Sequence, residues 1–144
     1  MKKTVLAFSR ITPPMIERLQ QDFEVIAPNP KLGDINAQFN EALPHAHGLI
    51  GVGRKLGREQ LESASKLEVV SSVSVGYDNY DVPYFNERGI MLTNTPDVLT
   101  ESTADLAFAL LMSSARRVAE LDAWTKAGQW KASVGAPLFG CDVH

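Results

Sequence analysis

The sequence predicts an α/β protein with a doubly wound parallel sheet of five strands, and two observations support this fold class. Short apolar runs alternate with helix-like segments over residues 4–93, an order that favours parallel strands with helices on both faces of the sheet. The chain has 144 residues, of which 44% are hydrophobic and 22% charged. It is therefore long enough to bury one core of ordinary composition.

Three strands are expected in the first half of the chain, at residues 4–8, 23–26 and 48–52. A helix is expected to begin at Pro13, because proline loses nothing at a helix start, where its missing N–H has no partner anyway. A second helix is expected over residues 34–43, since the apolar residues recur there every four positions and share one helical face.

Two further strands, at residues 67–73 and 90–93, complete the predicted sheet. Short helices are expected before each of them, at 58–63 and 83–88, and Gly89 is a typical residue to end the second. The resulting order alternates strand and helix throughout, which predicts that all five strands run parallel.

A long helix is expected over residues 101–126. Thr100 can cap it with its hydroxyl, and Glu101 suits the positive end of the helix dipole. Residues 104–112 are apolar nearly all the way round, so this part should be covered on several sides. The cover is either another domain or subunit, or the core of a monomer built around this helix.

Composition excludes several classes of function. The net charge is −3 and the basic residues are scattered, so a nucleic-acid partner is not expected. No apolar run is long enough for a membrane span. Cys141 is the single cysteine, which excludes an internal disulfide and fits a cytoplasmic location. His45 and His47 have no further ligands at metal-binding spacing, so no metal site is expected.

The best candidate site follows the strand 67–73, where Val75 and Gly76 stand at its predicted carboxyl end. Ligands of open α/β sheets bind beyond the carboxyl ends of strands, and backbone N–H groups at a small residue can wrap a carboxylate. The alternative is an ordinary turn that uses Gly76 for its positive φ. Asp78, Asn79 and Asp81 are expected to cap local N–H groups in either case.

Three motifs together carry a family resemblance: SVGYDN at 74–79, TNTPDVLTESTAD at 93–105 and SSARR at 113–117. With them the chain resembles the D-isomer-specific 2-hydroxyacid dehydrogenases, in the branch of the glyoxylate/hydroxypyruvate and 2-ketogluconate reductases. The resemblance implies a cytoplasmic enzyme that transfers a hydride between NAD or NADP and a small 2-keto or D-2-hydroxy acid.

The same resemblance implies an organisation. Residues 1–99 would be a flavodoxin-like substrate-binding domain. Residues 100–144 would hold the helix 101–126, through which members of the family form homodimers, and a linker that leads into a Rossmann domain for the cofactor.

Site residues follow from the resemblance in part. The backbone amides of Val75 and Gly76 would hold the substrate carboxylate. Thr103 would lie against the cofactor, or would simply help to satisfy the helix terminus. Arg54, beyond the strand 48–52, would face the same cleft and attract an anionic substrate, or would be a solvated loop cation.

No catalytic residue is expected within these 144 residues. The family's arginine, glutamate and histidine and its G-x-G-x-x-G loop lie further along, and the nearest pattern, at 51–57, has its third glycine one position late. The chain is therefore expected to be an N-terminal portion that is inactive alone. An alternative is a non-enzymatic, NAD-responsive dimerisation module, of the kind used by corepressors in the same family. An FMN-binding domain is remote, because residues 9–14 offer no glycine.

Overall fold

The computed structural model describes residues 1–133 and 135–143. The chain divides into two compact units, Met1–Asp97 and Val98–His144.

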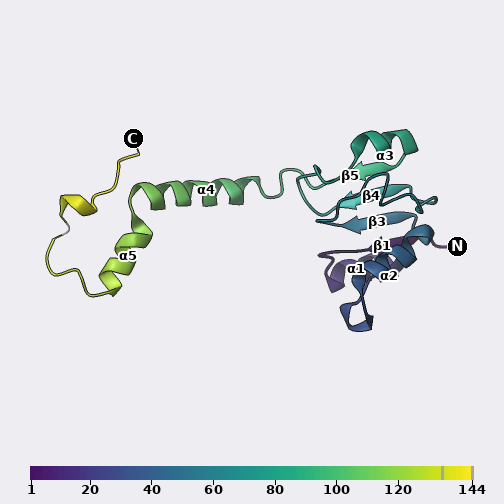
Figure 1. Ribbon diagram of the computed structural model, residues 1–144, viewed down its shortest axis with the longest axis horizontal. Coiled ribbons are helices and arrows are strands. Elements are labelled where there is room, and N and C mark those ends of the chain that lie inside the picture. Colours follow the sequence, from purple (N-terminus) through teal and green to yellow (C-terminus); the bar gives the residue numbers. More distant parts are fainter. Residues whose placement is uncertain (134, 144) are drawn as a thin grey trace. The chain divides into compact units, whose positions relative to one another are not determined.

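The first unit is built on a five-stranded parallel sheet in the order β2-β1-β3-β4-β5 (Figure 1). The strands are β1 Thr4–Ala7, β2 Glu24–Ile26, β3 Gly48–Gly51, β4 Val69–Ser72 and β5 Met91–Thr93. This is the order of flavodoxin-like doubly wound sheets. The predicted fold class is confirmed, and all five expected strands form within one or two residues of their expected bounds.

Three helices connect these strands: α1 Pro13–Gln20, α2 Ile35–Ala42 and α3 Val82–Arg88. Each begins at the residue that the sequence offers for it. Pro13 opens α1, and the carboxylates of Asp34 and Asp81 accept the backbone N–H of Asn36 and Tyr84 at 2.9 and 3.1 Å. Such side-chain caps satisfy backbone donors that the first helical turn leaves free. Two 3-10 turns, η1 Pro30–Leu32 and η2 Leu43–His45, flank α2.

The core lies between the sheet, the helices α2 and α3, and the turns that follow β3. Phe39 of α2 and Phe85 of α3 are each 1% exposed. The largest fully buried side chains are Phe39, Phe85, Leu6, Leu43, Leu49, Leu56, Leu61 and Val70. Burial of these apolar side chains is the main source of stability for the first unit, which carries the candidate site.

The expectation of a helix over residues 58–63 is wrong. These residues form consecutive turns. The N–H of Leu61 bonds to the carbonyl of Gly57 at 3.0 Å, as in a helix, but the next bond runs from Ala64 to Leu61 with the shorter three-residue spacing. A single helical turn fixes several dihedral angles for one hydrogen bond, so such a short segment does not propagate. The crossover between β3 and β4 is accordingly made by turns.

In the second unit the expected continuous helix 101–126 is also wrong. The structure has two helices, α4 Thr100–Ala115 and α5 Val118–Lys126, followed by the 3-10 turn η3 Ala136–Leu138. Arg117 lies between them with φ 54° and ψ 34°, a left-handed conformation that ends a helix. Its guanidinium bonds to Glu120 at 2.5 and 2.7 Å and to the carbonyl of Pro137 at 2.5 Å, and these contacts hold the break in place.

The expected N-cap of α4, Thr100, is wrong. Leu99 is the N-cap, and no side chain caps that helix terminus. The hydrogen bond from Arg117 lowers the pKa of the Glu120 carboxyl below its ordinary value.

Among the described residues, no helix is both long and apolar enough to cross a membrane.

Gly140 should be intolerant of any side chain, because it packs against the end of α4. A Cβ there would collide with the carbonyl oxygen of Ala115 and lie 2.7 Å from the Cα of Arg116. We expect Gly140→Ala to detach the segment that follows η3 and to break the 2.7 Å hydrogen bond from the N–H of Cys141 to Ala115. Hydrogen exchange of the Cys141 amide measures this loss.

The matched control is Gly135→Ala. An added Cβ at Gly135 meets only the ring of Pro137 at 3.6 Å, which is an ordinary contact. Equal protection of the Cys141 amide in both variants would contradict the packing described for Gly140.

Candidate functional site

The candidate site lies just beyond β4, where Val75 and Gly76 follow the last strand residue, Ser72. β4 is flanked by β3 and β5, and the carboxyl ends of these parallel strands meet at one edge of the sheet. Val75 is 41% exposed, and Gly76 is exposed as well. The two residues are thus accessible at the edge where open α/β sheets bind ligands.

The backbone amides of Val75 and Gly76 are not used by the sheet. The N–H of Val73 makes a last ladder-like bond to the carbonyl of Gly51 at 3.0 Å. Beyond it, neither the N–H of Val75 nor that of Gly76 donates a hydrogen bond to any residue that the structure describes. Both donors are therefore available to a ligand.

Hydrogen bonds to the neighbouring carbonyl groups set the direction of these amides. The N–H of Thr95 donates to the carbonyl of Ser74 at 3.0 Å, and the side-chain Nδ2 of Asn94 donates to the carbonyl of Val75 at 2.9 Å. In a planar trans peptide the N–H points opposite to the C=O. The amides of Val75 and Gly76 therefore both face away from the segment that follows β5.

Two serine hydroxyls support the turn that contains Val75 and Gly76. The hydroxyl of Ser74 donates to the carbonyl of Gly76 at 2.7 Å and lies 2.8 Å from the hydroxyl of Ser72, which is buried. Gly76 is not among the glycines with positive φ, and a Cβ on it would meet nothing closer than Asp78 Oδ2 at 3.9 Å. A need for positive φ therefore does not explain this glycine, whereas open space above its backbone suits an approaching ligand.

Of Asp78, Asn79 and Asp81, the three residues expected to cap local N–H groups, Asp81 alone does so. No backbone N–H of a described residue donates to the side chain of Asp78 or Asn79, so the expectation is wrong for these two. Asp81 caps α3 through the N–H of Tyr84, as expected. Asn79 donates from Nδ2 to the backbone carbonyl of Arg54 at 2.7 Å, which joins the loops after β3 and β4. Among the described residues there is no group of three or more His, Cys, Asp or Glu that could hold a metal ion.

The side chain of Arg54 lies against α2. Its guanidinium stacks 4.1 Å above the ring of Phe39 and donates from Nη2 to Asn36 Oδ1 at 2.6 Å. It lines a hollow of about 680 Å³ between α2 and the turns after β3, whose lining does not include Val75 or Gly76. The structure thus does not bring the guanidinium together with the two amides, and a substrate contact by Arg54 stays a prediction.

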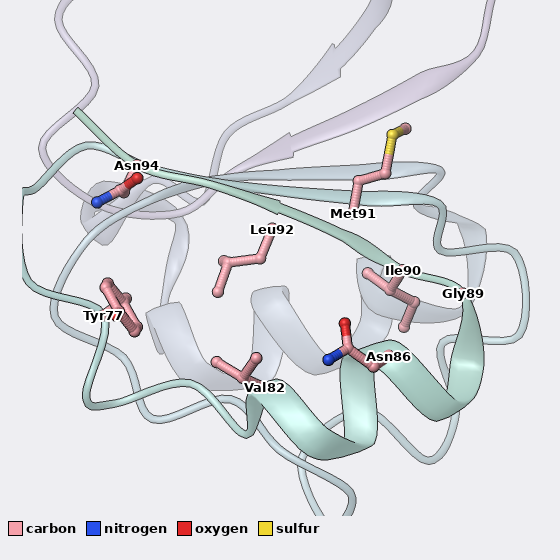
Figure 2. A pocket seen from close by; sticks show the side chains of 8 residues that line it. All are labelled: Tyr77, Val82, Asn86, Gly89, Ile90, Met91, Leu92 and Asn94. Carbon is pink, nitrogen blue, oxygen red and sulfur yellow. The ribbon is translucent and has the colours of Figure 1, made fainter. Parts of the chain in front are cut away.

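A second hollow adjoins the site, between α3 and β5 (Figure 2). It has a volume of about 490 Å³ and is lined by Tyr77, Val82, Asn86, Gly89, Ile90, Met91, Leu92 and Asn94. Tyr77 and Asn94 lie at one end of it and Gly89 at the other (Figure 2). Its polar side-chain groups are the amides of Asn86 and Asn94 and the hydroxyl of Tyr77, and the other side chains are apolar.

Asn94 is the residue that the sequence reasoning missed. A signal for it exists, because Asn94 comes directly after β5, just as the candidate site comes after the neighbouring strand β4. Polar residues that follow adjacent parallel strands are brought to the same edge of a sheet.

Thr103 belongs to the second unit, in the first turn of α4, and is exposed. Its N–H donates to the carbonyl of Leu99 at 2.9 Å, and its hydroxyl does not cap the helix. The role of Thr103 beside a cofactor stays a prediction.

The sequence matches known proteins over its whole length. The family model of the D-isomer specific 2-hydroxyacid dehydrogenase catalytic domain matches residues 5–133. A glyoxylate/hydroxypyruvate reductase B from Yersinia enterocolitica is 45% identical over 144 residues, which is all of this chain and 44% of that relative. The chain therefore spans less than half the length of this curated relative.

Solved structures show the same likeness. A 2-hydroxyacid dehydrogenase from Ketogulonicigenium vulgare has a TM-score of 0.78 at 29% identity, over 99% of this chain and 45% of its own. An NADPH-dependent glyoxylate/hydroxypyruvate reductase from Sinorhizobium meliloti, in complex with NADP and malonate, has a TM-score of 0.73 at 31% identity, over 99% of this chain and 44% of its own. By sequence and by fold, this chain belongs to the D-isomer specific 2-hydroxyacid dehydrogenase family.

Proposed function

We propose that this chain is the substrate-binding part of a cytoplasmic D-2-hydroxyacid dehydrogenase that reduces a small 2-keto acid, such as glyoxylate, hydroxypyruvate or 2-ketogluconate, with NADH or NADPH. The observation that carries the proposal is the pair of free amides of Val75 and Gly76, which face the same way at the carboxyl edge of the sheet. The names of the relatives supply the substrate class.

The chemistry assigned to the two amides is capture of the substrate carboxylate. Each N–H donates to one carboxylate oxygen, and hydrogen bonds to an ionised acceptor are stronger than those to a neutral one. Neither residue carries a charge, so a substrate held by this pair alone binds weakly. The amides fix the acid end of the substrate and leave its keto group for the part of the enzyme that carries the chemistry.

A nicotinamide cofactor, when bound, supplies the hydride for the reduction. Of the residues in this chain, we assign Thr103 to the cofactor side, because it lies exposed at the start of α4, where N–H groups and the helix dipole favour anionic ligands. We assign residues 1–99 to substrate binding and 100–144 to the connection with the cofactor domain, a division that includes Val134 and His144, outside the described residues. The break between the two compact units, after Asp97, supports this division.

Titration of the ¹⁵N-labelled chain with glyoxylate tests the carboxylate site. We expect the amide signals of Val75 and Gly76 to shift most, and glycolaldehyde, which lacks the carboxylate, to leave them unchanged. An absence of glyoxylate-dependent shifts at both amides would overturn the proposed function. Because these 144 residues contain no G-x-G-x-x-G loop, we expect the purified chain to show no NADPH oxidation with glyoxylate.

We further propose that the chain forms a homodimer through α4. Every residue from 100 to 111 is exposed, including Leu106, Phe108, Leu110 and Leu111 at 49% to 65%. Apolar surface on this scale marks an interface, and the family resemblance indicates a second copy as its occupant.

Phe108→Asp should convert the dimer to a monomer, because a carboxylate at the centre of an apolar interface loses its hydration without gaining a partner. Sedimentation velocity measures the change. Leu32→Asp is the control, since Leu32 is 79% exposed in the first unit, outside the proposed interface, and should leave the dimer intact. A wild-type chain that sediments as a monomer at micromolar concentration would contradict the assignment of α4.

A further inference from the structure

We propose that Asn94 is a positioning residue for substrate binding: its side-chain amide sets the direction of the Gly76 N–H by holding the carbonyl of Val75. This inference rests on the proposed function, because it assigns a role within the same carboxylate site. It names a residue that makes no contact with the substrate itself.

The two amides of the site are held in different ways. The peptide that carries the Val75 N–H is fixed by backbone, through the 3.0 Å bond from the Thr95 N–H to the Ser74 carbonyl. The peptide that carries the Gly76 N–H is fixed by a side chain, through the 2.9 Å bond from Asn94 Nδ2 to the Val75 carbonyl. Substitution can therefore remove one of the two supports and leave the other in place.

Asn94 is itself well placed for this task. The residue before it, Thr93, pairs with Ser71 of β4 and donates from its hydroxyl to that of Ser71 at 3.1 Å. The residue after it, Thr95, is tied to Ser74. With backbone anchors on both sides and a half-buried side chain, Asn94 loses little further freedom when it makes its bond, so the site is set before a ligand arrives.

The bond also strengthens when a ligand binds. A carboxylate oxygen that accepts the Gly76 N–H polarises that peptide and makes the Val75 carbonyl oxygen a better acceptor. Donation from Asn94 to the same carbonyl enhances the acidity of the N–H in turn, because hydrogen bonds in a chain polarise one another. Asn94 thus favours the ligand-bound state without touching the ligand.

The hollow in Figure 2 supplies a matched control residue. Asn86 lines it from α3, as Asn94 does from the segment after β5 (Figure 2). Among the described residues, the side chain of Asn86 bonds neither to Val75 nor to Gly76. Loss of Asn86 therefore removes a similar side chain from the same hollow and leaves both peptides held.

The test is an NMR titration of the ¹⁵N-labelled chain with glyoxylate, for wild type, Asn94→Ala, Asn94→Gln and Asn86→Ala. For Asn94→Ala we expect roughly fivefold weaker glyoxylate binding, the loss of about one hydrogen bond. In the free protein its Gly76 amide signal should shift while the Val75 amide signal stays. Asn94→Gln retains the donor and should restore most of the affinity, and Asn86→Ala should bind as wild type.

Each outcome decides between the two proposals. Unchanged glyoxylate binding in Asn94→Ala, with wild-type shifts at Val75 and Gly76, would overturn the positioning role and leave the proposed function standing. Equal loss in Asn94→Ala and Asn86→Ala would also overturn it, as a general effect of the hollow. No binding by the wild-type chain removes the proposed function and this inference with it. If Asn94→Ala loses its dispersed spectrum, Asn94→Thr, which is too short to reach and suits an extended segment, provides the same comparison.

Discussion

Phe39→Ala should destabilise the first unit by about 3–5 kcal/mol, the cost of emptying a buried phenylalanine site. Phe39 is 1% exposed, and its ring packs edge-on against Phe8 with centroids 5.7 Å apart. The guanidinium of Arg54 lies 4.1 Å above the same ring. Alanine leaves a cavity, ends the aromatic pair and removes the surface on which Arg54 rests. Urea denaturation followed by circular dichroism measures the change in the free energy of unfolding.

Phe139→Ala is the matched control, since Phe139 is 64% exposed in the second unit. Its removal should change the free energy of unfolding of the first unit by less than about 0.5 kcal/mol, as is usual for surface positions. Arg54→Ala isolates the cation–π contact and should cost at most about 1 kcal/mol, because the guanidinium is only partly buried. A loss below about 1 kcal/mol for Phe39→Ala would show that α2 does not pack as described.

The fold of the first unit could be predicted from sequence because its signals are local and agree with one another. Each strand is a short apolar run, and Pro13, Asp34, Asp81 and Gly89 mark helix ends at the residues where the structure has them. Such agreement between local preference and global fold is typical of sequences that specify one structure. The sheet order then follows from the few topologies open to alternating strands and helices.

The break between α4 and α5 depends on a contact between residues distant in sequence. The guanidinium of Arg117 donates to the carbonyl of Pro137, twenty residues further along, and the apolar pattern before and after Arg117 does not indicate the break. The turns at 58–63 have a different reason, because so short a segment gains few hydrogen bonds for the dihedral angles that a helix would fix.

The sequence indicates the position of the candidate site, because Val75 and Gly76 follow a predicted strand. It does not indicate the direction of their amides. Which way their amides face depends on hydrogen bonds from Asn94 and Thr95, about twenty positions away. The same limit applies to Arg54, whose side chain stacks on Phe39 because α2 offers it an aromatic face.

Gly76→Pro should weaken glyoxylate binding at least tenfold, because proline has no N–H and so removes one of the two donors of the carboxylate site. A hydrogen bond to a charged group contributes about 1.5–3 kcal/mol, which corresponds to a tenfold loss or more. Gly76→Ala is the matched control. It keeps the N–H, the backbone there has no positive φ, and its Cβ enters open space with Asp78 Oδ2 no closer than 3.9 Å.

The comparison between the two variants separates the donor from the shape of the backbone. Both add atoms at the same Cα, so a ligand that depends only on open space above Gly76 should be weakened by alanine and by proline alike. A ligand that depends on the N–H should be weakened by proline and largely kept by alanine. We expect the second pattern, with dispersed spectra for both variants as evidence that the sheet is intact. Similar glyoxylate affinities for Gly76→Pro and wild type would show that the amide of Gly76 takes no part in holding the carboxylate.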